Sequence, residues 1–296
     1  MCKVIRKGIR RGVQRYRCTH CKMNFQNVHR KQRIQTSLWN QYVWHRQTIP
    51  QLAERYHKST RWIRQQLDHA PLRTFHLYPQ PIIGIADVTF WGRGYGVIVF
   101  RSWDLKQNLY WTEVATERIA DYAEGRHILA DLGYSFDAIV LDGRRGIRDL
   151  FQDIPVQVCH FHQIAILKRY LTSKPKLDAG RELWDIGKTL SKTEEVVFME
   201  ALKQWYTRWR TFLMERTYAE DGTHWQYTHR RIRAAYRSLT TNLPYLFTYQ
   251  KYPHLNIPNT TNSLDGSFGH LKDLLGLHRG LKRHRRWRLI QEILAK

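Results

Sequence analysis

One stretch, residues 136–163, constrains the fold more than any other part of the chain. It begins with an apolar run, Phe136–Leu141, which predicts a strand buried on both faces, and Asp142 follows at the carboxyl end of that strand. A short helix and a second apolar run come next, before a Cys-x-x-His pair, Cys159 and His162, that opens another helix. Open α/β sheets place ligands and chemistry at the carboxyl ends of their strands. Asp142 is therefore a candidate site residue, although an acid in this place can also serve only as a strand-end cap.

Further strands are predicted upstream of this stretch. Residues Ile82–Trp91 form an apolar run that is interrupted by Asp87, and Val97–Arg101 and Asn108–Ala115 add two more strands. A helix is predicted over Glu117–Leu132. Three strands in a meander, a helix, a strand, a helix and a strand follow the order of a ribonuclease H-like α/β fold with a mixed sheet.

Two acids meet in that arrangement, because the first and fourth strands of the order lie side by side. Asp87 and Asp142 would then face each other at the centre of the sheet. An acid in a buried strand is costly unless it binds a cation or a hydrogen-bond donor. Paired carboxylates in a basic protein indicate a site for a divalent metal and for phosphoryl transfer.

The charge of the chain points to a polyanionic partner. Lys and Arg number 49 and Asp and Glu 25, which gives a formal net charge of +24. Twelve Lys and Arg residues precede the first acid, Glu54, and seven stand in the last twenty residues beside one acid, Glu292. A compact domain with this excess repels itself unless it binds a polyanion. The excess favours nucleic acid as the partner, and a basic surface that is merely solvated is the alternative.

The segment after Met1 lacks the apolar region of a signal peptide, and the chain has no apolar run of membrane-spanning length. We therefore expect a cytoplasmic, nucleoid-associated protein with reduced thiols and no membrane partner.

The first 25 residues predict a basic hairpin that ends in a Cys-x-x-Cys pair, Cys18 and Cys21. Such a pair holds tetrahedral Zn2+ when further ligands face it, and Cys2 is the one other cysteine nearby. The pattern is similar to the second half of a zinc ribbon, as if the first half lay before Met1. Either the zinc site is partial, or His20 or His29 supplies a fourth ligand, or both cysteines are ordinary residues of a hairpin.

A helix-turn-helix is predicted over Thr48–Asp68. Its second helix would place Arg61, Arg64 and Gln65 outward, toward a DNA groove, and a plain helical hairpin is the alternative. At the other end of the chain, residues 277–296 predict a basic helix. Its arginines would line one face and follow a phosphate backbone rather than read bases; they include Arg283, Arg285 and Arg286.

The motifs around the acids resemble those of Mutator-like DDE transposases of bacterial insertion sequences. Asp87 stands in ADVTFWG, Asp142 in LDGRRGIRDLF, and the Cys-x-x-His pair in VCHFHQ. Residues 259–272, NTTNSLDGSFGHLK, are similar to the family segment N-T-x-N-x-x-E-x-x-F-x-x-L-K, which puts Asp265 at the third acid. The resemblance covers residues 82–290 and departs from the family in this Asp for Glu.

The resemblance implies a site of three carboxylates, Asp87, Asp142 and Asp265, that bind two Mg2+ or Mn2+ ions roughly 3.5–4 Å apart. It implies a transposase of a mobile element that nicks DNA by hydrolysis and transfers the strand. The DNA partners would be the terminal inverted repeats and the target, with a homodimer or larger assembly on the ends. The alternative is a catalytically decayed DNA-binding protein that keeps the zinc-ribbon and helix-turn-helix parts.

Asp142 and Asp265 are 123 positions apart, which is too far for one crossover, and the family places an all-helical insertion there. Helices are predicted over 177–190, 193–216 and 223–239. Trp205, Trp209 and Phe212 recur at helical spacing, which favours core packing, with contact to a flipped base as the alternative. Within the family, the role of Cys159 and His162 stays open between a metal role and local packing.

These expectations divide the chain into four parts. They are a partial zinc-ribbon hairpin (1–30), a helix-turn-helix domain (31–72), a ribonuclease H-like catalytic domain (80–172 and 255–296) and a helical insertion domain (173–254).

Overall fold

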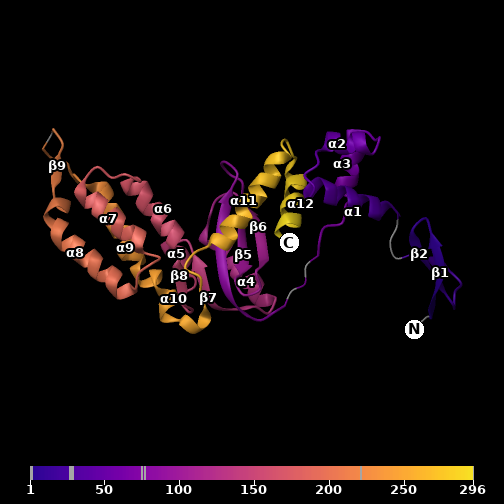
Figure 1. Ribbon diagram of the computed structural model, residues 1–296, viewed down its shortest axis with the longest axis horizontal. Coiled ribbons are helices and arrows are strands. Elements are labelled where there is room, and N and C mark those ends of the chain that lie inside the picture. The colour runs from indigo at the N-terminus through magenta and orange to yellow at the C-terminus, as the bar shows by residue number, and fades with distance from the viewer. Residues whose placement is uncertain (1–2, 27–29, 75, 77, 221, 296) are drawn as a thin grey trace. The chain divides into compact units, whose positions relative to one another are not determined.

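The computed structural model describes residues 3–26, 30–74, 76, 78–220 and 222–295 (Figure 1). The chain separates into two compact units, of which the first comprises residues 1–75 and 269–296 and the second residues 76–268. None of the helices within the described ranges has the length and apolar character that a membrane span requires.

The second unit is built on a mixed five-stranded sheet in the order β6-β5-β4-β7-β8. β5 runs antiparallel to both of its neighbours, whereas β7 is parallel to β4 and β8 is parallel to β7. The first and fourth strands therefore lie side by side, as predicted, and the sheet is consistent with a ribonuclease H-like fold. The strands are β4 (Pro81–Phe90), β5 (Gly96–Ser102), β6 (Gln107–Val114), β7 (Ser135–Leu141) and β8 (Val156–Val158).

The sequence forms this sheet because its central strands are almost wholly apolar. Five successive residues of β5, from Gly96 to Phe100, are buried, as are the last four of β7. Helix α4 (Ile119–Asp131) packs on β5 and β6, and the short helix α5 (Arg145–Asp149) packs on α4. Gly125 allows the close approach of α4, because a Cβ atom there would lie 2.3 Å from the Phe100 ring.

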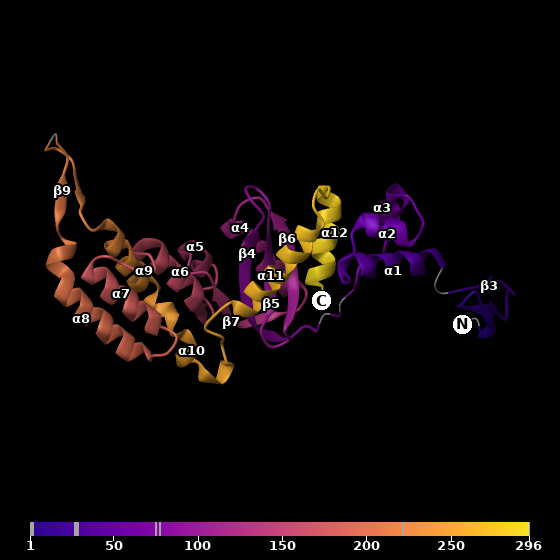
Figure 2. The ribbon, with the colours of Figure 1, turned by 45° about the horizontal axis from the view of Figure 1, so that its top comes forward.

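A helical segment follows the sheet, and its helices lie next to one another in both ribbon views (Figure 2). The predicted helix over residues 223–239 is wrong at its start. A hairpin of two short strands occupies this region instead, and the next helix begins at Arg230. Thr and aromatic residues with high strand propensity fill the hairpin, and Gly222 has a positive φ of 68° between its strands. The elements are α6 (His160–Leu171), α7 (Asp178–Thr189), α8 (Glu195–Leu213), β9 (Arg216–Tyr218), β10 (Trp225–Tyr227), α9 (Arg230–Leu246), α10 (Thr248–Lys251) and the 3-10 helix η1 (Pro253–Leu255).

The predicted core role of the three aromatic residues in α8 is confirmed. Trp205 is 2% exposed, and its indole N–H donates to the backbone oxygen of Ala179 at 2.9 Å. Trp209 and Phe212 are half-buried against the same core. The buried surface of these rings holds α8 against its neighbours α7 and α9.

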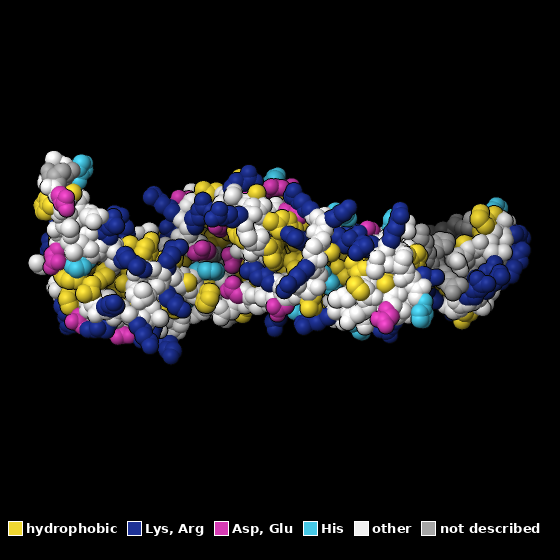
Figure 3. Space-filling view, turned by 90° about the horizontal axis from the view of Figure 1, so that it is seen from above, with side chains coloured by type: hydrophobic (Ala, Val, Ile, Leu, Met, Phe, Trp, Pro, Cys, Tyr) yellow, Lys and Arg dark blue, Asp and Glu magenta, His cyan; other side chains and the backbone are white. Residues whose placement is uncertain are grey.

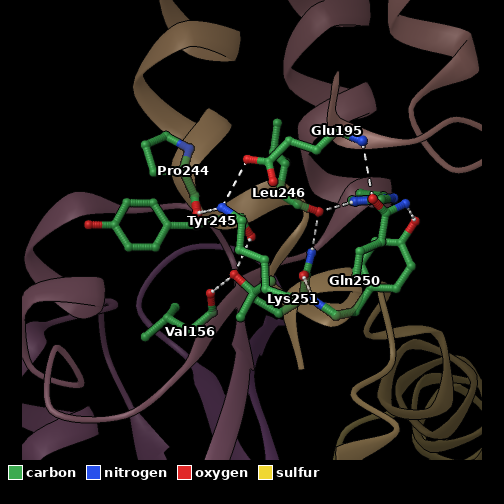
Figure 4. A network of polar contacts seen from close by, with 11 residues as sticks. Val156, Glu195, Pro244, Tyr245, Leu246, Gln250 and Lys251 are labelled. Atoms are coloured by element: carbon green, nitrogen blue, oxygen red, sulfur yellow. Dashed lines mark hydrogen bonds and ion pairs between the residues drawn. The ribbon is translucent and has the colours of Figure 1, made fainter. Parts of the chain in front are cut away.

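The helical segment is fastened to the free edge of the sheet by polar contacts (Figure 4). The Thr248 hydroxyl donates to the backbone oxygen of Val156 in β8 at 2.6 Å. The fully buried Gln157 donates to the oxygen of Leu246 at 2.9 Å and accepts from the backbone N–H of Tyr249 at 3.0 Å. These contacts use polar groups of an edge strand that would otherwise be unpaired.

The first unit contains a three-stranded antiparallel sheet with β2 in its centre, and several helices. Thr48 and Ser59 stand at the two predicted helix starts: Thr48 N–H donates to the Gln51 side chain at 2.8 Å, and Ser59 accepts from Trp62 N–H at 3.2 Å. The elements are β1 (Val4–Arg10), β2 (Val13–Cys18), β3 (Asn24–Phe25), α1 (Arg30–Val43), α2 (Ile49–Arg55), α3 (Thr60–Asp68), the last part of α11 (Asn262–Leu277), and α12 (Arg283–Leu294).

Arg285 does not lie on an exposed basic face, so that expectation is wrong. Its side chain is buried and donates to both carboxylate oxygens of Asp68, at 2.7 and 2.6 Å. The guanidinium holds the pKa of Asp68 below its ordinary value. Glu292, on the same helix, is 3% exposed and accepts from the backbone N–H of Arg73 at 2.9 Å. Residues 269–296 therefore belong with the N-terminal helices, because charge pairing and buried leucines on α12 join them.

Candidate metal centre

Asp87 and Asp142 lie at the same level of the sheet. β4 and β7 pair in parallel with Ile85 opposite Val140, so two residues further along each strand Asp87 stands level with Asp142. β7 and β8 pair with Leu141 opposite Val158, which brings Cys159 to the same level. The carboxyl ends of three neighbouring strands therefore present these residues at one edge of the sheet.

His162 reaches this edge from the first turn of α6, which begins directly after β8. Residues two apart on a helix point in nearly opposite directions, since each residue advances by about 100°. His160 accordingly points into the helical segment. It is fully buried and bonds to the backbone oxygen of Leu246 at 2.6 Å and to the hydroxyl of Ser191 at 3.1 Å. His162 points the other way, and its Nε2 lies 4.0 Å from a carboxylate oxygen of Asp87.

Asp265, which is distant in sequence from the strands, lies in the first turn of α11. The segment before it is fastened to the start of α6, where the backbone N–H of His160 donates to the oxygen of Asn259 at 2.9 Å. Thr261 N–H donates to the Cys159 sulfur at 3.3 Å, and the Thr261 hydroxyl donates to a carboxylate oxygen of Asp265 at 3.1 Å. Cys159 is fully buried, and its contacts with Thr261 hold the start of α11, which carries the third acid, next to the start of α6.

The three side chains of Asp87, His162 and Asp265 converge. Each offers one ligand atom, and these atoms all lie within 4.8 Å of one another. Asp142 is not a member of this group, although its charge acts on both Asp87 and His162. Asp87 and Asp265, the first and third predicted acids, therefore lie close enough to share an ion. Asp142, the second, acts on Asp87 through its negative charge.

Two pKa values at the centre depart from their ordinary range. Burial raises the pKa of Asp87 to about 7, and the charges of Asp265 and Asp142 act in the same direction. The nearby Cys159 sulfur raises the pKa of His162 to about 9, with further contributions from the Asp87 and Asp142 carboxylates. A histidine with this pKa carries a positive charge at neutral pH and lowers the pKa of Asp87 below the value that burial alone would give.

These residues fit a divalent cation. Asp87 is 7% exposed and lies beside two further carboxylates, so its negative charge is disfavoured unless a cation offsets it. Mg2+ and Mn2+ prefer carboxylate oxygens, which Asp87 and Asp265 present close together. Asp87 and Asp265 offer the oxygen ligands that these ions prefer, and His162 offers a third ligand atom when its imidazole is neutral. When no ion is bound, a protonated His162 balances part of the charge of the acids.

The role of Thr261 gives a testable expectation. Thr261→Val keeps the shape of the side chain but removes the hydroxyl that orients Asp265 and contacts Cys159. We expect metal affinity to fall by about 10-fold or more, as for other groups that orient metal ligands. Titration of the protein with Mn2+, followed by calorimetry, measures this. Ser267→Ala is the matched control, since that hydroxyl bonds only to the backbone oxygen of Ser263 one turn away. Equal affinity of both variants would show that Thr261 does not position the acid.

The remaining predicted site residues lie in the first unit. Arg61, Arg64 and Gln65 are exposed on α3, as expected, and Arg283 is exposed on α12. Arg286 is half-buried. Their contact with DNA stays a prediction.

Two of the predicted zinc ligands, Cys2 and His29, lie outside the described residues. Cys18 is buried and Cys21 is exposed, at the turn between β2 and β3. Across the described ranges, the group of Asp87, His162 and Asp265 is the one set of three potential ligands close enough to share an ion. Zinc binding at the hairpin therefore stays a prediction.

The chain matches no model of a protein family, and no curated protein matches its sequence. Among solved structures it is similar to the chain in "Drosophila P element transposase strand transfer complex". The identity is 11%, the match covers 94% of each chain, and the TM-score is 0.45. A likeness of this degree carries no conclusion about what the chain does.

Proposed function

We propose that the protein is a DDE-type DNA transposase that nicks the ends of its own element by metal-dependent hydrolysis and transfers the strand. The observation that carries this proposal is the convergence of Asp87 and Asp265 at the carboxyl edge of a mixed sheet, with Asp142 level with Asp87. Acids from three distant parts of the chain meet there, and such clusters bind the cations that assist phosphoryl transfer.

The chemistry divides between the cation and the chain. A divalent cation held by Asp87 and Asp265, with Asp142 beside them, supplies Lewis-acid assistance to displacement at a phosphodiester. The chain itself holds Asp265 in place through Cys159 and Thr261, and its buried surroundings exclude bulk water from Asp87. His162 balances part of the negative charge when the cation is absent.

The surface supports DNA as the substrate. Lys and Arg side chains are spread widely over the face that Figure 3 presents, and the net charge is +24. Positive surface of this extent binds phosphate backbones with a strong dependence on salt. In the same proposal, the exposed α3 residues and the hairpin at the N-terminus, with Zn2+ at Cys18 and Cys21, bind the terminal repeats. Two copies or more act together on two DNA ends.

One experiment separates this function from that of a decayed DNA-binding protein. The purified protein is incubated with Mg2+ or Mn2+ and with DNA that carries the inverted repeats flanking its own gene. We expect nicks at the repeat ends only when metal is present. Retention of that DNA without any nick, at all metal concentrations, would support the decayed binder and overturn the enzyme.

A further inference from the structure

The helical segment carries a groove of about 840 Å³ that none of the roles above uses. It follows one face of α9, where Arg230, Arg233, Arg237 and Thr241 recur at helical spacing from the hairpin end to the sheet end. From Arg230 to Asn242 the groove extends for about 18 Å, at a rise of 1.5 Å per residue. All of its lining residues belong to the second unit.

The lining combines aromatic rings with positive charge. Four tyrosines line it, and two of them, Tyr206 and Tyr236, stack at 5.0 Å with their planes 10° apart. Three arginines line it too, whereas none of the described Asp or Glu side chains does. Arg233 is held in place, because it donates to the oxygen of Leu213 at 2.7 Å and lies over the Tyr227 ring at 3.5 Å.

Two further arginines of the groove are available to a ligand. Arg230 and Arg237 are exposed, and the guanidinium groups of both have no hydrogen-bond or ion-pair partner among the described residues; the one recorded bond of Arg237 is from the Thr240 hydroxyl to its backbone oxygen. Exposed arginines beside aromatic faces suit a ligand that is anionic and carries flat rings.

The sheet end of the groove adjoins the candidate metal centre. Asn242 forms this end; it donates to the side chain of Gln163 at 2.7 Å, next in the chain to His162. A Cβ atom at Gly143, which follows Asp142, would lie only 2.7 Å from the Asn242 amide nitrogen. Asn242, which ends the groove, thus contacts the residues that directly follow His162 and Asp142 in the chain.

We propose that this groove binds an unpaired nucleic-acid strand whose continuation enters the metal centre. Phosphates would pair with Arg230 and Arg237, and bases would stack on the tyrosine rings, as in other single-strand sites. An intact duplex keeps its base faces stacked inside, so it cannot use the rings. This inference rests on the proposed function, because it takes the strand to be the one that the centre cuts.

The test uses the full chain and a short single-stranded oligonucleotide that contains photoreactive bromouracil. We expect crosslinks at the tyrosines that line the groove, Tyr170, Tyr206, Tyr227 and Tyr236. The double variant Arg230→Glu with Arg237→Glu is expected to lose them and to bind the oligonucleotide about 10-fold more weakly at physiological salt. Lys203→Glu with Arg210→Glu, exposed on α8 and outside the groove, changes the charge equally and is expected to retain the crosslinks.

Two results would contradict the proposal that the groove binds an unpaired strand. One is crosslinking that maps elsewhere or persists unchanged in the groove variant. The other is a duplex of the same sequence that competes as well as the single strand. This test can fail independently of the test of the proposed function. If the parent chain does not nick DNA but still forms the groove crosslinks, the transposase proposal is wrong and the groove is still a single-strand binding site.

Discussion

Asp87→Ala is expected to abolish metal-dependent nicking, with a loss of about 1,000-fold or more. The estimate corresponds to several kcal/mol of transition-state stabilisation, which is what a catalytic cation supplies and what a missing ligand removes. Asp87 is the most buried of the acids at the centre, and the charges of both other carboxylates act on it, so its loss removes the best-shielded oxygen ligand. Cleavage of end-labelled DNA at saturating Mg2+ and Mn2+ measures the loss.

The same variant is expected to fold and to bind DNA normally. The pKa of Asp87 is raised to about 7 in the folded chain from an ordinary value of 3.8. The folded state therefore binds more protons than the unfolded state between these values, and the metal-free stability falls as pH rises through that window. Removal of the carboxyl group removes this penalty together with the attraction between Asp87 and His162, so we expect the variant to remain folded at pH 7 to 8.

Asp137→Asn is the control for Asp87→Ala. Asp137 is an exposed acid on β7, and its replacement changes the net charge by the same amount without touching the centre. We expect nicking by this variant to match the parent chain. Full nicking by Asp87→Ala would mean that the acids at the sheet edge are not the catalytic ones.

Local sequence was enough to place the acids on the sheet. Apolar runs that end in Asp142 or are interrupted by Asp87 left few alternatives to buried parallel strands, and the strand order put the two side by side. Asp265 was placed by its motif. What brings it to the sheet is the pair Cys159 and Thr261, which are 102 residues apart, and a contact of this kind leaves no local pattern.

His162 was recognised as part of a motif, but not as a neighbour of Asp87. Its direction depends on where α6 starts, because one residue of shift would rotate the ring by about 100°. Arg285 shows the same limit. Alternating arginines predict a basic helix face, but the sequence does not reveal which of them meets Asp68, 217 residues away. The hairpin before α9 was missed because its strands are only three residues long.

Trp205→Ala is expected to destabilise the helical segment by about 3–5 kcal/mol. The ring is 2% exposed, stacks on Tyr236 at 5.2 Å and donates to the backbone oxygen of Ala179, so its removal leaves a cavity and takes away a buried hydrogen bond. Hydrogen exchange of the amides of α7, α8 and α9 in the full chain measures the loss.

Trp225→Ala supplies the comparison, because that tryptophan is 44% exposed on the β10 strand and should change stability by about 0.5 kcal/mol or less. The pair also decides between the two roles that the spacing of aromatic residues in α8 allows. A tryptophan that only contacts a base would leave exchange unchanged on replacement and weaken DNA binding alone. Tyr236 lines the groove and stacks on Trp205. Loss of Trp205 should therefore also weaken single-strand binding, in proportion to the fraction of molecules in which the helical segment is locally unfolded.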